Sequence, residues 1–505
     1  MTTFDRDAGL ERLAADRFDV LVIGGGITGA GVALDAASRG LRTALVERDD
    51  FGAGTSSRSS KLVHGGLRYL SQGDYRLVAQ ALAERQRLLR NAPHLVRPLP
   101  FLYPSYGSRS RMRAVSTALW LYDLTGGFRI GSLHRRLSVA DALARTPVLR
   151  ADGLVGAHLY LDAHADDARL TLALVRTAVV DHRAVAANHV AVRAVVPGGA
   201  EVDAGGRAIG VRASVVVNAT GVWADTLAGE GRATIRPAKG AHVTVPAAVV
   251  PTDVALVLPV PADGRSIFVV PWPGTGRVYI GTTDTDYDGP LDRPTCTAED
   301  TSYLLDAANA ALATTLTTDD VVGSWAGLRP LLAGAGTQRS ADLSRRHRVT
   351  RGPDGVVTIS GGKLTTYRAM AADTVDEVES VLGRARTRSR TAKLALRGAT
   401  GAGDHLGSRY GSEARVVRAM IAADPSLAEP LVPTLPYVRA EALYAARYEM
   451  ARTLDDVLSR RTRSGILARD ASVAAAPDVA RLLAPELGWD GAEIDAQVHA
   501  YRAGT

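Results

Sequence analysis

FDVLVIGGGITGAGVALDAASRGLRTALVE, residues 18–47, is the stretch of sequence that decides the fold. Residues 18–23 are an apolar, β-branched run of strand length. Gly24, Gly26 and Gly29 follow in the spacing G-x-G-x-x-G. In that spacing the glycines allow a tight turn, a close approach of the backbone to a pyrophosphate, and close packing of a helix on the strand. The stretch therefore predicts a site for the diphosphate of a dinucleotide.

The residues after the glycines complete the same unit. A helix is expected to end at Gly40, and a second strand, residues 42–46, runs into the acid Glu47. A carboxylate at the end of this second strand can accept a hydrogen bond from a ribose 2′-hydroxyl. A glycine turn alone is weak evidence, but strand, turn, helix, strand and acid together predict a Rossmann-type dinucleotide-binding unit.

The segment that follows, residues 52–70, suits a flavin better than a nicotinamide. It crowds small hydroxyl residues together and then adds lysine, histidine, glycine and arginine: GAGTSSRSSKLVHGGLRYL. Small residues let the backbone pass close to a large planar ring. The glycine motif also stands near the N-terminus without a second copy, as in domains that hold FAD with their first βαβ unit. We therefore expect FAD as the cofactor.

Two later segments end in small-residue turns that can approach the same cofactor. Residues 214–221 (SVVVNATG) are a buried strand that runs into Thr220 and Gly221. Residues 356–368 (VVTISGGKLTTYR) give a strand, two glycines and a helix that starts near Thr365. The N-terminus of that helix would offer N–H groups and a positive dipole end to the negative charge of a reduced flavin. The predicted sheet is thus assembled from segments that are distant in the chain.

Composition narrows the classes of partner. The 505 residues carry a net charge of +7, which favours anionic partners. No nucleic-acid motif is present and aromatic residues are only 5% of the chain, so we expect no nucleic-acid binding. A phosphorylated substrate or an anionic lipid surface is favoured. The single cysteine and the lack of paired histidine spacings predict no metal site, and no apolar run is long enough to predict a membrane-spanning helix.

The order of elements predicts two interleaved parts and a third domain. An FAD-dependent oxidoreductase domain is expected over residues 17–383, with cofactor-binding segments 17–90, 150–225 and 320–383. Segments 91–149 and 226–319 are expected to form an antiparallel-sheet substrate lobe, including a hairpin of strands 267–271 and 278–282. Residues 384–397 are interpreted as a basic linker, and residues 398–505 as an all-helical C-terminal domain.

The amphipathic segment 109–124 (RSRMRAVSTALWLYDL) has two interpretations. Met112, Val115, Leu119 and Tyr122 share one helical face. With the basic start of the segment, this face fits a helix that lies on a membrane surface. Packing of the same face on the sheet of the substrate lobe is the favoured interpretation. The linker 384–397 offers a second, weaker basic candidate for contact with lipid headgroups.

Several motifs together resemble one family, the FAD-dependent glycerol-3-phosphate dehydrogenases. The stretches that carry the resemblance are IGGGITGAGVALDAASRG, TSSRSSKLVHGGLRYL, NATGVWAD, KGAHVTVP, IGTTDTDY, GLRPL and GGKLTTYR. Their order and spacing match as well, over nearly the whole chain. The resemblance implies a glutathione-reductase-like FAD domain, non-covalent FAD, and oxidation of sn-glycerol 3-phosphate to dihydroxyacetone phosphate with electrons passed to a membrane quinone. It also suggests a homodimer.

The motifs assign site residues by position. Basic residues beside glycine at expected sheet edges suit a phosphate, which arginine and lysine bind well. By resemblance, the substrate pocket is lined by Arg68, Tyr69, His242, Arg329, Arg345 and Lys363. Arg345 is the least secure of these, because LSRRHRVT departs from the family pattern and Arg346 or Arg348 can take its place. The expected FAD contacts are Gly24, Gly26, Gly29, Glu47, Thr55, Ser56, Ser60, Lys61, Leu62, Thr220, Gly221, Gly362, Leu364 and Thr365.

A division of roles follows for the reaction. His242 has the ordinary pKa nearest neutrality, so it is the expected general base, and Arg329 is expected to stabilise the developing alkoxide. An arginine base of depressed pKa is the costlier alternative. The open alternatives for the whole protein are an oxidase that uses oxygen, an amine-oxidising relative, and a flavoprotein that only senses glycerol phosphate. A quinone-linked enzyme without a spanning helix is expected at the cytoplasmic face of the membrane, as a peripheral protein.

Overall fold

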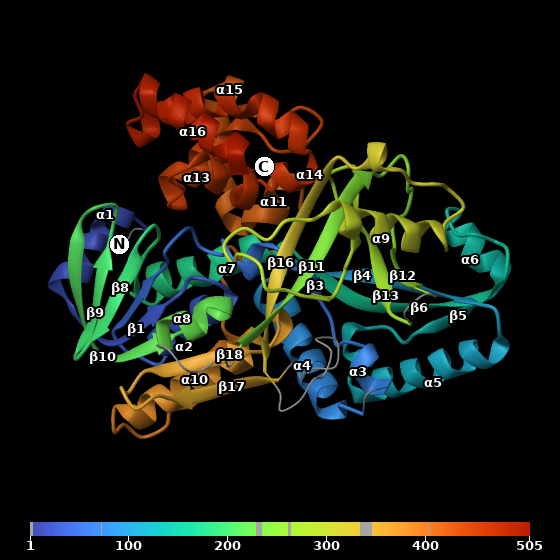
Figure 1. Ribbon diagram of the computed structural model, residues 1–505, viewed down its shortest axis with the longest axis horizontal. Coiled ribbons are helices and arrows are strands. Elements are labelled where there is room, and N and C mark those ends of the chain that lie inside the picture. Colours follow the sequence, from blue (N-terminus) through green and yellow to red (C-terminus); the bar gives the residue numbers. More distant parts are fainter. Residues whose placement is uncertain are drawn as a thin grey trace.

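The computed structural model describes residues 4–71, 73–228, 235–260, 264–333, 346–401 and 403–504 (Figure 1). Two sheets and a helical C-terminal domain make up the molecule, and the helical domain lies above the junction of the two sheets in Figure 1. The predicted fold, with a Rossmann-type sheet, a second sheet and an all-helical C-terminal domain, is confirmed.

The first sheet carries the parallel strands that the glycine motif predicts. Its order is β17-β18-β10-β1-β2-β7, and β9 and β8 continue from β10. The four neighbours β18, β10, β1 and β2 run parallel. Strand bounds are β1 (Arg17–Ile23), β2 (Thr43–Val46), β7 (Val185–Ala187), β8 (Ala191–Val196), β9 (Gly199–Asp203), β10 (Ala208–Asn218), β17 (His347–Arg351) and β18 (Val357–Gly361).

Apolar side chains on the two faces of this sheet form two cores. One core joins the sheet to helices α2 (Ile27–Ser38), α7 (Asp167–Arg176) and α10 (Tyr367–Val381). The other joins it to α1 (Arg6–Ala15) and to the β8–β9 pair. Because successive strand residues face opposite sides, Val20 and Val22 enter the first core while Leu21 enters the second. A sheet buried on both faces is what a parallel α/β arrangement requires.

The second sheet forms the substrate lobe. Its order is β15-β11-β14-β13-β12-β4-β6-β3, with β16 beside β11 and β5 beside β6. It is antiparallel as predicted, except that β12 and β4 pair in parallel. Strand bounds are β3 (Leu62–Val63), β4 (Val96–Tyr106), β5 (Arg135–Leu137), β6 (Leu154–Ala165), β11 (Ile235–Pro246), β12 (Ala255–Pro259), β13 (Ser266–Trp272), β14 (Arg277–Gly281), β15 (Thr285–Asp286) and β16 (Gly323–Leu332).

Helices close both sides of the second sheet. Helices α6 (Val139–Arg145) and α9 (Ala298–Asn309) share a core with it on one side. On the other side α5 (Arg109–Thr125) packs through Met112, Leu119 and Tyr122, each at most 2% exposed. The favoured prediction for that helical face, packing on the sheet, is therefore confirmed. Three further helices of this part are α3 (Arg68–Ser71), α4 (Tyr75–Asn91) and α8 (Ala224–Ala228).

Two predictions about segments need correction. Strands β3, β6 and β16 fall in segments that were assigned to cofactor binding, yet they belong to the second sheet. The apolar spacing of residues 162–180 predicts a helix from the first of these residues, but the chain is strand as far as Ala165, because β6 pairs with β4 along its whole length. The helix α7 begins at Asp167, where the side chain of Asp166 accepts from Arg169 N and caps it.

The C-terminal domain consists of short helices around two apolar clusters. Its helices are α11 (His405–Tyr410), α12 (Ala414–Ala423), α13 (Arg439–Tyr448), α14 (Ser464–Leu467), α15 (Arg469–Leu487) and α16 (Gly491–Gly504). A π-helical turn, η11 (Asp456–Arg461), precedes α14 and faces the first sheet's part of the molecule. Among the described residues, no helix is both long enough and apolar enough to cross a membrane.

Candidate active site

Four loops meet at one edge of the first sheet. Because β1, β2, β10 and β18 run parallel, the segments that follow them all leave at their carboxyl ends. These segments are the glycine turn after β1, Glu47 after β2, Thr220 and Gly221 after β10, and Gly362 after β18. Ligands bind at this edge of an open α/β sheet. Segments far apart in the sequence are thus brought together, as the sequence predicts.

The glycine turn has no room for side chains. Gly24 has a φ of +104°, and a Cβ there would lie 2.7 Å from the carbonyl oxygen of Ala219. A Cβ on Gly29 would lie 1.9 Å from the carbonyl oxygen of Gly24. Both contacts are with backbone, so no rotamer change can relieve them. Gly24 is predicted to allow the tight turn and Gly29 the close packing of helix on strand, and at both positions a side chain would collide with the backbone.

The N-terminus of α2 faces this edge with its amides only partly used. Gly26 is the N-cap residue and provides no side chain to cap the helix. The hydroxyl of Ser56 accepts from Ile27 N at 2.8 Å, and Thr55 donates to the carbonyl oxygen of Leu328 at 2.5 Å. These contacts hold the hydroxyl-rich loop against the helix end. The remaining first-turn amides suit an anionic diphosphate.

Glu47 lies against the same turn. Its carboxylate accepts from Gly25 N at 2.6 Å and from Asp49 N at 2.9 Å. Burial raises the pKa of this carboxyl above its ordinary value. The side chain is therefore fixed beside the glycine turn, at the position where a ribose hydroxyl of a dinucleotide is bound.

The remaining predicted cofactor residues occupy the other loops. Thr220 donates to the side-chain oxygen of Asn218 at 2.7 Å, and Gly221 follows with a φ of +65°. Thr365 is buried and contacts the backbone of His64, which joins the β18 loop to the 52–70 segment. Leu62, Gly362 and Leu364 lie at the ends of β3, β18 and the short helix η7 (Leu364–Thr366).

These features fit FAD. A turn that excludes Cβ atoms, a helix N-terminus whose amides are only partly used and a fixed carboxylate occur together at one sheet edge. Each suits one part of a dinucleotide: the turn and the helix end suit the diphosphate, and the carboxylate suits the ribose.

His242 lies in β11 at the centre of a second group of residues. Its Nε2 is 2.9 Å from the hydroxyl of Ser60, and its ring stacks on Trp325 with centroids 4.6 Å apart. The residue is 2% exposed, and its Nδ1 has no hydrogen-bond partner in the part of the chain that the structure describes. Stacking and burial hold the ring in one orientation, with Nε2 directed at Ser60.

The electrostatic setting of His242 differs from the prediction. Burial, reinforced by the charges of Lys61 and Arg329, lowers its pKa well below the ordinary value. The ordinary pKa, on which the choice of His242 as general base rests, therefore does not apply in the folded protein. The imidazole is held neutral, so it is free to accept a proton but is a weaker base than a solvated histidine.

Arg329 is held on the neighbouring strand β16. Its guanidinium donates to the carboxylate of Asp284 at 3.0 Å, to the Thr282 hydroxyl at 3.2 Å and to the Thr283 carbonyl at 3.1 Å. The ion pair with Asp284 offsets part of its charge. A guanidinium fixed in this way is a preorganised donor for a developing negative charge.

Lys363 and Tyr69 form a third group. The Lys363 ammonium donates to the carbonyl oxygens of His64 and Gly65 at 3.2 and 3.4 Å, and it lies 5.4 Å from the centre of the Tyr69 ring. The 60–69 segment links this pair to Ser60 and His242. The structure therefore places Lys363 and the predicted base His242 against one segment, which also carries Tyr69.

Two predicted residues cannot be placed in the pocket. Arg345 and the side chain of Arg68 lie outside the described part of the chain. Of the two substitutes, Arg346 forms an ion pair with Asp74 at 2.9 Å and is exposed, and Arg348 is exposed on β17.

Lys61, one of the predicted FAD contacts, has a buried side chain. It is 2% exposed and forms an ion pair with Asp167 at 3.3 Å, and its ammonium lies 4.4 Å from the centre of the Trp325 ring. Burial lowers its pKa to about 7, although Asp167 opposes the shift. Its ammonium group donates to the carbonyl oxygens of Ser57 and Ser59 and so holds the hydroxyl-rich loop in place.

The sequence analysis missed three residues that shape this region. Trp325 stacks on His242, Asp167 accepts from Ser59 and Lys61, and Arg463 of the C-terminal domain donates to Asp167 and to the Ser57 carbonyl. Trp325 stands two residues before the GLRPL motif, and that position was the available signal. Asp167 lies where an acid is common at a helix start, and no pattern marks Arg463.

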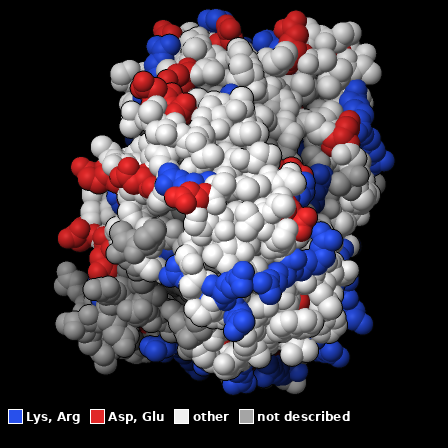
Figure 2. Space-filling model, turned by 90° about the vertical axis from the view of Figure 1, so that its right-hand side faces the viewer, with Lys and Arg blue, Asp and Glu red and all other residues white. Residues whose placement is uncertain are grey.

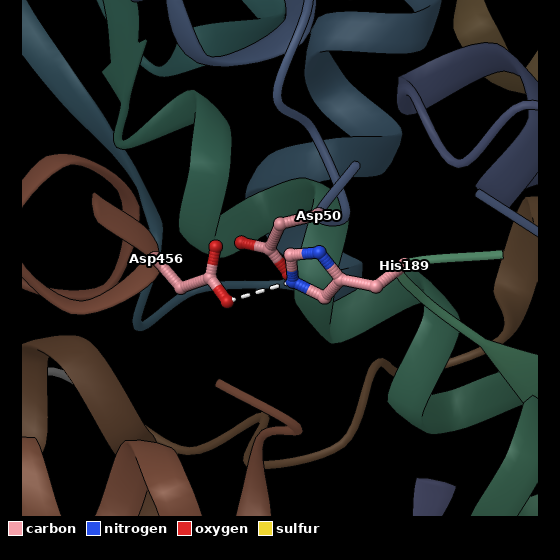
Figure 3. A group of neighbouring side chains, drawn as sticks. All are labelled: Asp50, His189 and Asp456. Carbon is pink, nitrogen blue, oxygen red and sulfur yellow. Dashed lines mark hydrogen bonds and ion pairs between the residues drawn. The ribbon is translucent and has the colours of Figure 1, made fainter. Parts of the chain in front are cut away.

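Asp50, His189 and Asp456 form a compact group near the junction with the C-terminal domain (Figure 3). His189 Nε2 is 2.9 Å from the Asp456 carboxylate. Asp50 accepts from both Arg460 and Arg461, and Arg460 also pairs with Asp456. Guanidinium groups already supply the positive charge that these carboxylates need, so the group is an ion-pair network that joins two domains.

Family models and relatives match this chain over nearly its whole length. The model described as FAD dependent oxidoreductase matches residues 19–377, and the C-terminal domain of alpha-glycerophosphate oxidase matches residues 357–494. Glycerol-3-phosphate dehydrogenase 2 of Mycobacterium tuberculosis is 42% identical, over 98% of this chain and 89% of that protein. A probable mitochondrial glycerol-3-phosphate dehydrogenase of Caenorhabditis elegans is 38% identical, over 96% and 73%.

Solved structures give the same result. A glycerol-3-phosphate dehydrogenase from Bacillus halodurans, complexed with FAD, superposes with a TM-score of 0.80 at 31% identity, over 99% of this chain and 96% of that one. The L-alpha-glycerophosphate oxidase of Mycoplasma pneumoniae, with FAD bound, superposes with a TM-score of 0.59 at 17% identity, over 75% and 99%. The second likeness concerns the fold alone.

Proposed function

We propose, from the premise that this chain belongs to the FAD-dependent glycerol-3-phosphate dehydrogenase family, that it oxidises sn-glycerol 3-phosphate to dihydroxyacetone phosphate and passes the electrons to a membrane quinone. The observation that carries the substrate proposal is the setting of His242. A buried, neutral imidazole contacts Ser60 and lies within electrostatic range of Arg329. A proton acceptor beside fixed cations suits an alcohol that carries a phosphate.

The protein's own groups divide the work on the C2 hydroxyl. Because Nδ1 of His242 is buried, its Nε2 takes the hydroxyl proton, either directly or through the Ser60 hydroxyl. Arg329, held by Asp284, stabilises the alkoxide as it forms. FAD, when bound, supplies the acceptor for the hydrogen that leaves C2 as hydride.

The phosphate needs separate binding groups. Lys363, with Tyr69 beside it, is placed to hold the phosphate, and Arg68 and Arg345 are proposed to assist. The two roles affect different kinetic constants. A proton acceptor stabilises the transition state and so raises kcat, whereas a phosphate ligand stabilises the bound substrate and the transition state alike and so lowers KM.

Substitutions of His242 and Lys363 test that division. We expect His242→Ala to lower kcat by roughly 10² to 10⁴-fold, the usual contribution of a general base. Lys363→Met and Arg345→Ala should chiefly raise KM. The exposed His499 on α16 provides the control, and His499→Ala should leave both constants unchanged. Equal losses of kcat at unchanged KM in the His242 and Arg345 variants would overturn the assignment.

A surface on α5 supports a membrane location. The packed face of this helix is buried, and its other side exposes Trp120 (51%), Leu121 (40%) and Leu124 (73%). Phe128 and Leu133, just beyond the helix, are also about half exposed, at 52% and 49%. Apolar residues gathered on one exposed surface in this way are typical of a site that enters a lipid interface.

Arginines surround these apolar residues. Those exposed between residues 109 and 136 are Arg109, Arg111, Arg113, Arg129, Arg135 and Arg136. The one acid in that stretch, Asp123, is 4% exposed. Figure 2 shows the side of the molecule that carries α5, with Lys and Arg gathered across its lower half. Basic and apolar side chains on one surface favour an anionic bilayer as the partner.

The alternative basic segment, residues 384–397, is less suited to lipid. Three of its arginines form ion pairs with acids of the first sheet's part of the molecule and of the C-terminal domain. Their charge is therefore already offset, which leaves α5 as the proposed membrane-facing surface.

Liposome binding tests the membrane proposal. The unmodified protein should bind anionic liposomes at low salt, and the double variant Trp120→Ser/Leu124→Ser should bind far more weakly while keeping its turnover with a soluble quinone analogue. Tyr448→Ser, at an exposed aromatic residue of the C-terminal domain, is the matched control. An unmodified protein that ignores anionic liposomes at low salt would contradict the membrane proposal and favour oxygen as the acceptor.

The acceptor itself is decided by one comparison of rates. The C-terminal model is named after an alpha-glycerophosphate oxidase, so oxidation by oxygen with release of hydrogen peroxide is the second candidate. Turnover of sn-glycerol 3-phosphate should be measured side by side with a quinone analogue and with oxygen. Faster turnover with the quinone analogue and little peroxide is expected, and the reverse result would establish the oxidase.

A further inference from the structure

A cavity lies between the second sheet and the C-terminal domain, apart from the cofactor edge. One wall is formed by β4, β6 and the β13–β14 hairpin, and the other by residues of and near α11 and α13. Its volume is about 70 Å³, several times the roughly 10–15 Å³ that one water needs. The polar and charged residues that line it are Lys61, His94, Arg97, His164, Asp166, Arg169, Thr275, Tyr279, His405, Ser408, Arg409 and Tyr437.

Most cations of this wall are paired with acids around it. The cations that line the cavity are Lys61, Arg97, Arg169 and Arg409, and Lys61 pairs with Asp167. Arg169 and Arg409 reach acids behind the wall, Glu449 and Glu441. No described residue forms an ion pair or hydrogen bond with the guanidinium of Arg97, and burial lowers the pKa of that group. Arg97 therefore brings to the cavity a positive charge that no described acid offsets.

Several lining residues also carry buried polar atoms without a partner. His94 is 2% exposed and Tyr437 is 1% exposed, and among the described residues neither His94 Nδ1 nor the Tyr437 hydroxyl has a hydrogen-bond partner. The same holds for Nη2 of Arg97 and Nε of Arg169. Buried polar groups are normally satisfied, and leaving one unsatisfied costs about 1–3 kcal/mol. Four such atoms around one cavity indicate a missing partner.

The histidines of the wall are consistent with a positive field. Burial and the charge of Arg169 lower the pKa of His94 to about 4. Burial and the charge of Arg97 do the same for His164. Both rings are therefore neutral near pH 7, and each can donate one N–H to an acceptor.

We propose that this cavity is a binding site for a phosphate-sized oxyanion, separate from the substrate pocket. An oxyanion supplies several acceptor oxygens and negative charge, which are what Arg97, His94 and Tyr437 lack. Inside a cavity of low dielectric, such charge-assisted hydrogen bonds are stronger than in water. The proposal does not depend on the proposed reaction, because its residues lie outside the groups assigned to proton transfer and phosphate binding there.

Lys61 connects the two places. Its side chain lines the cavity, and it also donates to the loop that carries Ser60. The cavity and the candidate active site are therefore separated by the side chain of Lys61. The cavity lies on the side of the Ser60 loop that meets the C-terminal domain.

The test is calorimetric titration of inorganic phosphate into the FAD-loaded protein at constant ionic strength, set with chloride. Phosphate can also enter the substrate pocket, so the titration is made in a Lys363→Met background. One saturable phosphate site is expected to remain there. Adding Arg97→Gln should weaken it at least tenfold, because a charged hydrogen bond contributes about 1.5–3 kcal/mol. Arg135→Gln, at an exposed arginine of β5, should leave it unchanged.

A milder variant covers the case in which Arg97→Gln does not fold. Tyr437→Phe removes one hydroxyl and should weaken phosphate binding by roughly 2–10-fold, with FAD content and circular dichroism unchanged. Absence of saturable binding in the Lys363→Met background would overturn the proposal. Binding that is equal in the Arg97, Tyr437 and Arg135 variants would overturn it as well.

Discussion

The cofactor edge of the first sheet and the junction with the C-terminal domain are both buried and polar, but they are built differently. At the cofactor edge, contacts are mostly with backbone, and the glycine turn uses residues within a few positions of each other. At the junction, charged side chains meet across the chain: Arg460 and Asp50 are 410 positions apart. A local spacing motif in the sequence can therefore predict a site such as the cofactor edge. The junction network forms only when the C-terminal domain packs against the rest of the chain.

The junction should be the more sensitive of the two regions to a single change. Asp50 accepts from Arg460, Arg461 and Asn188 and is fully buried. Asp50→Asn leaves two buried guanidinium groups short of charge, which costs about 3–5 kcal/mol in comparable buried pairs. Thermal and urea denaturation should show this loss, and limited proteolysis should show a loosened C-terminal domain.

The neighbouring Asp49 provides the control for that experiment. Its side chain is 55% exposed and pairs with the exposed Arg48, so Asp49→Asn should change the free energy of unfolding by at most about 0.5 kcal/mol. Equal effects of the two substitutions would mean that the junction network adds no stability.

The glycine turn should respond with a loss of cofactor rather than of the whole fold. A Cβ at Gly29 would press on the backbone of Gly24, so Gly29→Ala must displace the turn. We expect weaker FAD binding and a loss of about 1–3 kcal/mol, the usual cost of overpacking. Flavin absorbance per protein measures the first and thermal denaturation the second. Gly210→Ala in β10, where a Cβ meets open space, should change neither FAD binding nor stability. Normal FAD binding by the Gly29→Ala variant would contradict the predicted role of the turn.

The smallest effect concerns pH at the junction. Burial alone would lower the pKa of His189, but Asp456 raises it; burial alone would raise the pKa of Asp456, but His189 and Arg460 lower it. The contribution of His189 to the free energy of unfolding is complete below about pH 6.5 and is lost as the pH rises through its raised pKa. The contribution of Asp456 to the free energy of unfolding is present above about pH 4 and is lost as the pH falls through its lowered pKa.

The pair should therefore stabilise the protein most between about pH 4 and pH 6.5. The difference in melting temperature between the unmodified protein and His189→Gln should shrink from pH 6 to pH 8, by an amount that corresponds to about 1 kcal/mol or less. A difference that grows over this range would show that the pair is not ionised as described.

The accuracy of the sequence predictions follows the same division. The hairpin β13–β14 and the packed face of α5 are found as predicted, because a period of two or of 3.6 residues is a local property. Strand β6 was mistaken in part for a helix, because its pairing with β4 depends on residues about sixty positions away. The ordinary pKa of histidine suggested a titrating His242, but burial in the folded protein reverses that expectation.

The sequence by itself determined the glycine turn, its strand–helix–strand setting and the family to which the motifs belong. These depend on steric limits and spacings that act within a short stretch of chain. Only the tertiary structure decided that Lys61 lies beneath the loop beside Trp325, that Arg463 reaches Asp167, and that a basic cavity opens at the junction. Burial and electrostatic pairing depend on which distant residues pack together, and no local pattern in the chain records that.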